Sequence, residues 1–413
     1  MARFLDVLLN QRLVGQLEQD DSGSLWFRYA EDWLASHDAV PLSHSLPLRK
    51  EPFKRNECRP FFAGLLPEEQ SREVIAKVLG VSSRNDFAIL ERIGGECAGA
   101  VMLVAPATAL SSIAGSYREL TKPELAGFIA QLPRRPLLAG QAGVRLSLAG
   151  AQGKLALAVD PDGAYRLPID GAPSTHILKP ESTRFELLVE NECFCMRLAE
   201  LAGLDVAKVQ IDDAEGRKFL LIERYDRILA PEGFPKRIHQ EDFCQALGIA
   251  PELKYQQEGG PNLKQCFELV RSVSSVPGVD VLRLFNAVIF NFLIGNNDAH
   301  GKNFSFLYRD GTARLAPLYD LVSTQAYPTL SADMAMKIGK ERNPMALTAK
   351  HWGRLFEDAG LNPTIAVRHL QVTARKVLNL IPKVDVAHET LPSLVRANCD
   401  RLLAIKWVGG GSS

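Results

Sequence analysis

Leu293-Ile-Gly-Asn-Asn-Asp-Ala-His-Gly-Lys-Asn-Phe304 joins an apolar run to a cluster of amide, carboxyl, imidazole and ammonium groups. The run from Leu282 to Ile294 is apolar on nearly all sides, which predicts a buried helix. Gly295 is expected to end that helix. The polar cluster would then be a loop at the end of a rigid core element, a common way of holding catalytic groups in place.

The order of residues in this loop indicates a specific chemistry. Asp298 and Asn303 have the spacing Asp-x-x-x-x-Asn of a protein-kinase catalytic loop, whose Asp accepts the proton of the substrate hydroxyl and whose Asn binds Mg²⁺. A strand is expected over Arg314 to Leu318, and Asp320 follows it, about where a kinase places its second metal-binding Asp. Mg²⁺ prefers a few hard oxygen ligands. We therefore expect Asn303 and Asp320 to bind Mg²⁺ and Asp298 to be the base.

Two further side chains of the loop are candidates for catalysis. Lys302 or His300 could neutralise the transferring phosphate. The alternative is that Asp298 and Asn303 merely cap a helix or close a turn. The density of polar residues favours the site, because a single cap does not need so many.

A kinase also needs a lysine on an upstream strand. Thr175-His-Ile-Leu-Lys179 supplies one at the end of an alternating strand. A helix is expected from Phe185 to Ala202, and its Glu190 and Glu192 could pair with Lys179 across strand and helix. Taken alone, such a lysine would be interpreted as a solvated edge charge.

A candidate phosphate-binding loop lies one strand earlier, between two strand-like runs. Its residues are mostly small, so backbone N–H groups can approach phosphate oxygens. They are Ala149, Gly150, Ala151, Gln152 and Gly153. The loop is not a Walker A motif, because G-x-x-x-x-G-K-[ST] is absent. A simple hairpin turn is the alternative, and the position before Lys179 disfavours it. Further along, Glu223 and Tyr225 end the last strand before the helical part, where a hinge could bind adenine.

The order of the remaining elements predicts a two-lobed α+β protein. Strands are expected over 3–9 and 12–29, Val144 to Val159, Ser174 to Lys179 and, as a pair, 206–211 and 219–224. Helices are expected over 67–79 and from Thr121-Lys-Pro-Glu124, and the chain is mostly helical after about residue 240. Residues 104–117 are expected to be a linker. The predicted domains are 1–105, 106–227 and 228–407, followed by a flexible tail at 408–413.

Composition excludes some classes of function. Lys plus Arg equals Asp plus Glu, 48 against 48, so there is no global attraction to nucleic acid or acidic membrane. The seven Cys lack a C-x-x-C motif and are expected to be buried thiols, which is typical of a reducing compartment. No signal-peptide pattern is present, and the most apolar segment is expected to be too short to span a bilayer. We expect a cytoplasmic protein without a membrane partner.

Several ordered motifs together resemble the HipA family, the serine/threonine-kinase toxins of HipBA toxin–antitoxin modules. They are Arg145-Leu-Ser-Leu-Ala-Gly-Ala-Gln152, Thr175-His-Ile-Leu-Lys179, Glu223-Arg-Tyr-Asp-Arg227, Gln240-Glu-Asp-Phe-Cys-Gln-Ala-Leu-Gly248, Lys254-Tyr255 with Gly259-Gly-Pro261, and Asp298-Ala-His-Gly-Lys-Asn303. The resemblance covers nearly the whole chain. It implies a bilobal kinase fold similar to protein and PI3/4-kinases, with a small β-rich N-terminal domain and an all-helical C-terminal lobe.

The resemblance also implies roles and partners. Asp298 would be the base, Asn303 and Asp320 the Mg²⁺ ligands, and Lys179 the ATP-phosphate lysine. Ser147 matches the family's self-phosphorylated serine, whose phosphorylation should eject the phosphate loop and silence the kinase. The implied partners are a HipB-like helix-turn-helix antitoxin, operator DNA reached mainly through that antitoxin, and an aminoacyl-tRNA synthetase substrate, notably glutamyl-tRNA synthetase.

The chain departs from the family in three respects, and two other functions are alternatives. Gly153 stands in the phosphate loop, and Tyr225 stands where Phe is also seen. The chain is somewhat short for the family. A lipid or small-molecule kinase of the same superfold would share the Asp-x-His-x-x-Asn loop. A catalytically idle antitoxin-binding co-repressor would not need the intact catalytic positions.

Overall fold

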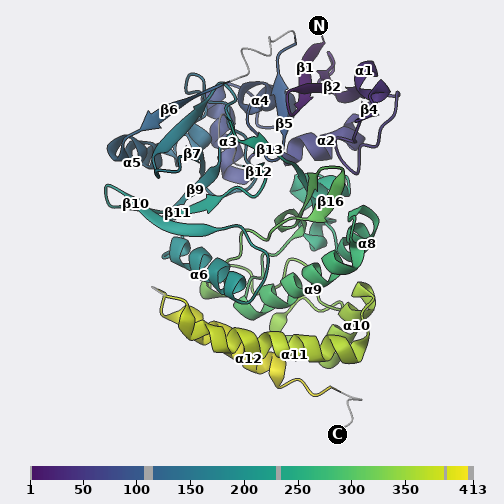
Figure 1. Cartoon of the computed structure of the whole chain (residues 1–413), viewed down its shortest axis with the longest axis vertical. Coiled ribbons are helices and arrows are strands. Elements are labelled where there is room, and N and C mark those ends of the chain that lie inside the picture. The colour runs from purple at the N-terminus through teal and green to yellow at the C-terminus, as the bar shows by residue number, and fades with distance from the viewer. Residues whose placement is uncertain (1, 107–114, 229–233, 386–387, 408–413) are drawn as a thin grey trace. The chain divides into compact units, whose positions relative to one another are not determined.

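The computed structural model describes residues 2–106, 115–228, 234–385 and 388–407 (Figure 1). The chain forms two compact units. Unit 1 contains residues 1–180, 212–252 and 307–311, and unit 2 contains residues 181–211, 253–306 and 312–413. Unit 1 carries two β-sheets and short helices, whereas unit 2 is mainly helical. The α+β fold predicted from the order of the elements is therefore confirmed.

Unit 1 is built on two β-sheets. The first has the strand order β4-β3-β2-β1-β5 and the second has the order β10-β11-β9-β7-β8-β6. Their strands are β1 (Arg3–Leu9), β2 (Arg12–Gln19), β3 (Leu25–Tyr29), β4 (Phe53–Lys54), β5 (Val101–Val104), β6 (Ser116–Leu120), β7 (Leu155–Val159), β8 (Tyr165–Ile169), β9 (His176–Pro180), β10 (Val209–Ala214) and β11 (Arg217–Glu223). β9 lies inside the second sheet, between β11 and β7, so Lys179 stands on an interior strand.

The remaining elements of unit 1 are short. They are α1 (Glu31–Ala35), α2 (Arg55–Gly64), α3 (Glu69–Leu79), α4 (Asp86–Ile93), α5 (Lys122–Gln131), α7 (Phe243–Ala246), β12 (Arg227–Ile228), β13 (Lys236–Arg237) and β14 (His239–Asp242). One buried hydrophobic cluster joins the two sheets, since it contains Phe27 of the first sheet and Phe219 of the second. Burying a large aromatic side chain stabilises a fold by about 1.5–3 kcal/mol relative to leaving it exposed. The two sheets therefore share one core.

A buried carboxylate joins residues that are far apart in the sequence of unit 1. Glu96 is 1% exposed and accepts hydrogen bonds from Arg227 (2.7 Å), Arg237 (2.9 Å) and Arg224 (3.2 Å). Burial alone would raise the pKa of Glu96, but the three guanidinium groups outweigh it and lower the pKa to about 2. Removing one partner of such a cluster would leave a buried charge uncompensated, which costs several kcal/mol.

A second buried carboxylate in unit 1 lies in a different environment. Glu241 accepts hydrogen bonds from the backbone N–H of His44 (2.9 Å), the hydroxyl of Tyr308 (2.5 Å) and the hydroxyl of Ser43. None of these donors carries a full positive charge. Burial therefore dominates and raises the pKa of Glu241 to about 7.

Unit 2 is organised around a central helix. Its elements are α6 (Leu188–Leu201), α8 (Leu263–Val273), α9 (Pro277–Ile294), α10 (Ala349–Ala359), α11 (Pro363–Leu380), α12 (Thr390–Leu403) and the hairpin strands β15 (Ser305–Arg309) and β16 (Thr312–Leu315), of which 307–311 belong to unit 1. α9 packs against α8 and α12 (Figure 1). Within the described ranges α9 is the one helix long and apolar enough to cross a membrane, and 67% of it is buried inside the protein.

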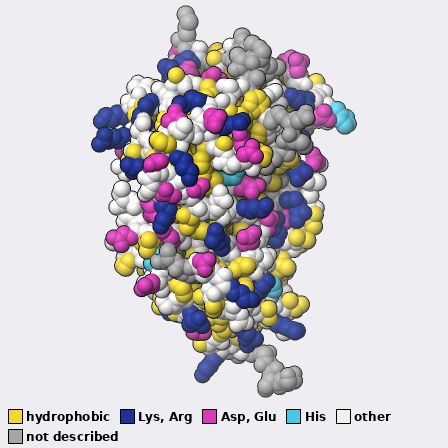
Figure 2. All heavy atoms as spheres, turned by 60° about the vertical axis from the view of Figure 1, so that its left-hand side comes forward, with side chains coloured by type: hydrophobic (Ala, Val, Ile, Leu, Met, Phe, Trp, Pro, Cys, Tyr) yellow, Lys and Arg dark blue, Asp and Glu magenta, His cyan; other side chains and the backbone are white. Residues whose placement is uncertain are grey.

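Several local predictions are confirmed. Thr121 caps α5 and forms a capping box with Glu124, Gly80 ends α3, and Gly295 ends α9 in the left-handed conformation. All seven Cys are free and buried. Figure 2 shows Lys and Arg interspersed with Asp and Glu over the face drawn, as expected from the equal numbers of acids and bases.

Other boundaries differ from the prediction. The strand expected from Val144 is wrong over residues 144–154, because Leu146 and Gly150 make isolated bridges to Glu96 and Pro67 instead of joining the sheet. β6 begins at Ser116, inside the expected linker over 104–117, most of which lies outside the described residues, as does the tail at 408–413.

Three further elements are shifted. α9 begins at Pro277, earlier than expected, and is therefore longer than the apolar segment that the sequence indicated. β10 extends to Ala214. β16 ends at Leu315, and Leu318 makes only an isolated bridge. Pro277 can stand in the first turn of α9, because the N–H that a proline lacks would have no partner within the helix at that position.

Candidate active site

The predicted site residues fall into two groups. Asp298, His300, Lys302, Asn303, Asp320 and Glu192 belong to unit 2. Ser147, the phosphate loop 149–153, Lys179, Glu223 and Tyr225 belong to unit 1. The pairing of Lys179 with Glu192 stays a prediction, because the two residues lie in different units.

In unit 2 the polar loop starts where α9 ends. Gly295 has φ +71°, and a Cβ there would lie 2.6 Å from Oε1 of Gln325, so the position requires glycine. Asn296 then donates to the side chain of Asn291 on α9 (2.8 Å), and the backbone N–H of Asp298 donates to Oδ1 of Asn296 (3.1 Å). The loop is thus attached to the rigid helix by side-chain amides.

The structure brings the two predicted metal ligands together. Nδ2 of Asn303 donates to Oδ2 of Asp320 over 3.0 Å, and Oδ1 of Asn303 accepts from the backbone N–H of His300 over 3.0 Å. Asp320 has φ +59°, a left-handed conformation that is uncommon for a residue other than glycine. Such a backbone persists only where its surroundings hold it, and it is typical of functional sites.

The chain between these two ligands is also fixed. The hydroxyl of Tyr319 donates to the backbone carbonyl of Lys302 (2.6 Å) and lies 2.7 Å from the hydroxyl of Ser305. Tyr319 directly precedes Asp320, and Lys302 directly precedes Asn303. The contact therefore holds the catalytic loop and the Asp320 segment side by side in register.

The donor set fits a Mg²⁺ ion. Mg²⁺ is usually bound by one or two carboxylates while water and substrate phosphate fill the remaining positions. Asp320 supplies a carboxylate, and the amide oxygen of Asn303 keeps a second lone pair besides the one that His300 uses. No group of three or more His, Cys, Asp or Glu that could hold a metal occurs in the described part of the chain.

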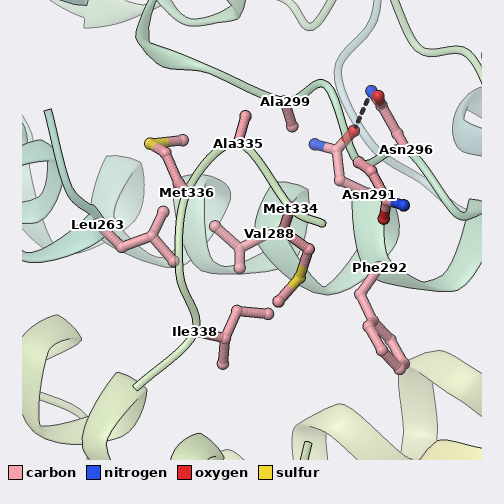
Figure 3. Close-up of a pocket in the computed structure, with 11 residues that line it drawn as sticks. Leu263, Val288, Asn291, Phe292, Asn296, Ala299, Met334, Ala335, Met336 and Ile338 are labelled. Atoms are coloured by element: carbon pink, nitrogen blue, oxygen red, sulfur yellow. Dashed lines mark hydrogen bonds between the residues drawn. The ribbon is translucent and has the colours of Figure 1, made fainter. Parts of the chain in front are cut away.

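The underside of the catalytic loop rests on apolar side chains. Figure 3 shows Val288 and Phe292 of α9, Leu263 of α8, and Met334 and Met336 of a following segment around a small pocket. Asn296, Asn297 and Ala299 also line this pocket, on either side of Asp298 in the sequence. The backbone N–H of Ala335 donates to the carbonyl of Asn297 over 2.7 Å. The catalytic loop is therefore held by a backbone hydrogen bond to the segment around Ala335 as well as by the side-chain amide of Asn291 on α9.

In unit 1 the phosphate loop is docked onto the N-terminal part of the chain. Ser147 is 0% exposed; its hydroxyl donates to the carbonyl of Leu65 (2.8 Å) and its N–H to the carbonyl of Glu96 (2.8 Å). Further along, the hydroxyl of Ser71 donates to the carbonyl of Ala151 (2.8 Å). Gly150 has φ +103°, so this turn also requires glycine.

Lys154 closes the same loop. Its Nζ donates to the carbonyl of Ala149 over 2.5 Å, and a Cβ on Gly150 would lie 2.6 Å from that nitrogen. Gln152 and Gly153 follow the turn without helix or strand structure. The loop therefore has a defined conformation that its own residues and the N-terminal part maintain.

The predicted hinge is anchored by alternate residues. Arg224 and Arg227 point inward to Glu96, and Asp226 accepts from the backbone N–H of Gly99 (2.7 Å). Glu223 and Tyr225 alternate with them and are partly exposed. The hydroxyl of Tyr225 donates to Oε1 of Gln240 over 2.5 Å. The backbone at the end of β11 is therefore held from inside, which suits a hinge that offers backbone groups to a base.

Sequence reasoning missed the residues that hold these groups in place. Thr324 accepts the N–H of Asn297 (2.8 Å), and Asn191 pairs with the backbone of Ser323. The partners are separated by many residues, and no local pattern connects them. The only signal was the position of Asn191 between the two glutamates of α6.

An α+β chain with an Asp-x-x-x-x-Asn loop, an adjacent Asn–Asp pair and a docked glycine-rich loop has the architecture of a kinase-like protein. Comparison with known families makes this specific. Residues 5–104 match the family model of the HipA N-terminal domain, and residues 146–381 match that of the HipA-like C-terminal domain. The chain belongs to the HipA family.

Individual relatives agree with this assignment. The chain is 52% identical over 384 residues to Y4mE of Sinorhizobium fredii, a protein inferred to be a kinase, covering 92% of this chain and 89% of the relative. It is 31% identical to the serine/threonine-protein kinase toxin HipA of Shewanella oneidensis, covering 97% and 96%. The solved complex of Shewanella oneidensis HipA with HipB and operator DNA matches with a TM-score of 0.82 at 30% identity, over 97% of this chain and 96% of that one.

Proposed function

We propose that this chain is an ATP- and Mg²⁺-dependent serine/threonine-protein kinase that acts as the toxin of a type II toxin–antitoxin pair in the cytoplasm. The observation that carries the proposal is the 3.0 Å contact between Asn303 and Asp320 beside the loop that bears Asp298. Asn303 and Asp320 come from two separate segments, and Asp298 stands five residues before Asn303, at the spacing of a kinase loop. Membership of the HipA family, with relatives named as kinases, supports the same activity.

Each residue then has a defined task. Asp298 accepts the proton of the acceptor hydroxyl as the new oxygen–phosphorus bond forms and the bond to the leaving ADP breaks. Asn303 and Asp320 hold Mg²⁺, which when bound neutralises charge on the transferring phosphate. Lys302 or His300 adds positive charge close to Asp298. Phosphoryl transfer needs mainly positioning and electrostatic stabilisation, which a rigidly supported loop provides.

The nucleotide is assigned to residues of unit 1. Lys179 binds ATP phosphates from an interior strand. The phosphate loop 149–153 covers the phosphates with backbone N–H groups. Glu223 and Tyr225 mark the hinge that binds adenine. The fixed loop conformation and the anchored end of β11 support these assignments.

Ser147 is proposed as the self-inactivation site. Its hydroxyl is buried against Leu65, so phosphorylation requires the loop to leave its docked position first. A phosphate carries about −1.5 to −2 charges at neutral pH, and in the docked position it would face the carbonyl oxygen of Leu65. The loop would therefore stay out after phosphorylation, and the phosphate-binding surface would be lost.

The proposed partners rest on the family. A HipB-like antitoxin and operator DNA reached through it are supported by the solved complex of the Shewanella relative. The proposed acceptor, an aminoacyl-tRNA synthetase such as glutamyl-tRNA synthetase, rests on the family resemblance; its phosphorylation would inhibit translation and promote dormancy.

An acceptor panel tests the proposal. The full chain is incubated with γ-labelled ATP and Mg²⁺ and with purified aminoacyl-tRNA synthetases, phosphoinositide vesicles or small hydroxyl compounds. Apart from Ser147 of the chain itself, we expect label on a synthetase serine or threonine only. Label on lipid or on a small compound alone would replace the proposal by a lipid or small-molecule kinase. ATP binding without any transfer would indicate an idle co-repressor.

A further inference from the structure

Asn191 uses its side-chain amide as a two-sided clamp on the backbone of one residue, Ser323. It lies on α6 in unit 2 and is 0% exposed. Its Oδ1 accepts the backbone N–H of Ser323 (2.8 Å), while its Nδ2 donates to the carbonyl of the same Ser323 (3.0 Å) and lies 3.2 Å from the hydroxyl of Tyr327. Only a carboxamide side chain combines an acceptor with two donors in this way. The residue type is therefore specified by the contact.

The clamped residue, Ser323, lies in the sequence between Asp320 and the residue that contacts the catalytic loop. Three residues before Ser323 stands Asp320, with its left-handed backbone and its contact to Asn303. One residue after it stands Thr324, whose hydroxyl accepts the N–H of Asn297 (2.8 Å) and donates to the carbonyl of Gly295 (3.2 Å). The segment 320–325 thus connects the proposed metal ligand to the base of the catalytic loop.

We propose that Asn191 is a positioning residue for phosphoryl transfer, an inference that rests on the proposed function. By fixing the backbone of Ser323, Asn191 holds Asp320 in contact with Asn303. It also keeps the hydroxyl of Thr324 in position to accept the backbone N–H of Asn297. Glu190 and Glu192 on the same helix are where sequence reasoning placed the functional groups of α6. The structure assigns the segment-holding role to the amide between them. The clamp acts on the backbone next to Asp320, which has a left-handed conformation. Loss of the clamp should therefore weaken Mg²⁺ binding more than it lowers the stability of the fold.

The test compares Asn191→Ala with a matched control on the same helix. Met196→Ala removes a buried side chain of α6, 1% exposed, without touching the clamp. Asn191→Asp is a second, isosteric variant that keeps the acceptor for Ser323 N–H but removes both donors and places a carboxylate against a carbonyl oxygen. Each full-length variant is measured by amide hydrogen exchange, by ATP binding at several Mg²⁺ concentrations, and by phosphoryl transfer.

If Asn191 positions the site, Asn191→Ala and Met196→Ala should differ in amide exchange and in the Mg²⁺ dependence of ATP binding. In Asn191→Ala the amides of Ser323 and Asn297 should exchange faster, and the Mg²⁺ concentration that gives half-maximal ATP binding should rise about tenfold, the loss expected for one to two buried hydrogen bonds. Binding of ATP without Mg²⁺ should not change. Met196→Ala should lower the melting temperature but leave the Mg²⁺ dependence as in the parent, because a merely structural residue changes the amount of folded protein and not its metal affinity.

Three outcomes would contradict the proposal, and they separate a failure of the positioning role from a failure of the proposed function. An unchanged Mg²⁺ dependence in both Asn191 variants, in a parent that transfers phosphate, would overturn the positioning role and leave the proposed function intact. A parent that transfers no phosphate would overturn the proposed function and the positioning role with it. Unchanged exchange at Ser323 in Asn191→Ala would refute the clamp whatever the activity of the parent.

Discussion

A negative charge at Ser147 should release the phosphate loop. The hydroxyl of Ser147 is completely buried and donates to the carbonyl of Leu65 over 2.8 Å. Ser147→Ala removes this one hydrogen bond at a cost of about 1 kcal/mol. Ser147→Asp places a group with acceptors only against a carbonyl oxygen, and burying such an unpaired charge costs several kcal/mol.

That cost is comparable with the sum of the polar contacts that hold the tip of the loop, whereas Leu146 and Leu148 beside Ser147 are buried in the core of unit 1. The loop is docked by the bridge at Gly150, by the 2.8 Å contact of Ser71 with Ala151, and by Lys154 on Ala149. Each of these contributes about 1 kcal/mol. We therefore expect Ser147→Asp to undock the loop rather than to unfold unit 1, which melting curves would check.

Limited proteolysis with trypsin measures this opening, because Arg145 and Lys154 flank the loop. Each 1.4 kcal/mol of lost docking raises the open population about tenfold, so Ser147→Asp should be cleaved after Arg145 and after Lys154 at least ten times faster than the parent. Ser147→Ala and the control Ser71→Ala should be cleaved only a few times faster. Cleavage of Ser147→Asp at the parent's rate, in folded protein, would refute the electrostatic account of the switch.

Two other predictions concern separate sites. Asp320→Ala should lose the Mg²⁺-dependent part of ATP binding, since the carboxylate is removed from the ligand pair; calorimetry showing undiminished affinity with Mg²⁺ would take Asp320 out of the metal site. Burial raises the pKa of Glu241 from its ordinary 4.5 to about 7, so the folded state keeps a proton that the unfolded state has lost, and stability should fall as pH rises from about 4.5 to 7. Glu241→Gln should flatten this dependence, on the order of 3 kcal/mol across the window, in urea titrations at several pH values; an unchanged slope would mean that Glu241 does not carry the proton.

Local signals in the sequence were enough for much of the fold. Thr121 and Glu124 form a capping box because both partners lie in one turn, and Gly295 ends α9 because the left-handed conformation favours glycine. The Asp-x-x-x-x-Asn spacing and the following strand correctly suggested that Asn303 and Asp320 would meet. These predictions succeeded because the interacting residues are close in sequence or joined by one short hairpin.

The failures have a common physical cause. Residues 144–154 are apolar enough for a strand, but their hydrogen bonds go to Glu96, Leu65 and Glu68, which belong to a distant part of the chain. The clamp of Asn191 on Ser323 likewise joins two separate segments. Composition and periodicity report local preference, whereas such contacts are decided by the tertiary fold.

The measurement that tests the central claim most directly is peptide mapping by mass spectrometry after incubation with ATP and Mg²⁺, with the parent beside Asp298→Asn. Both start from protein shown to be unmodified. The account predicts a phosphate on Ser147 in the parent and none in the variant, because Asp298 accepts the hydroxyl proton. Equal phosphorylation of both proteins would contradict the assignment of Asp298 as the base, and no phosphate on either would contradict the proposed self-inactivating kinase.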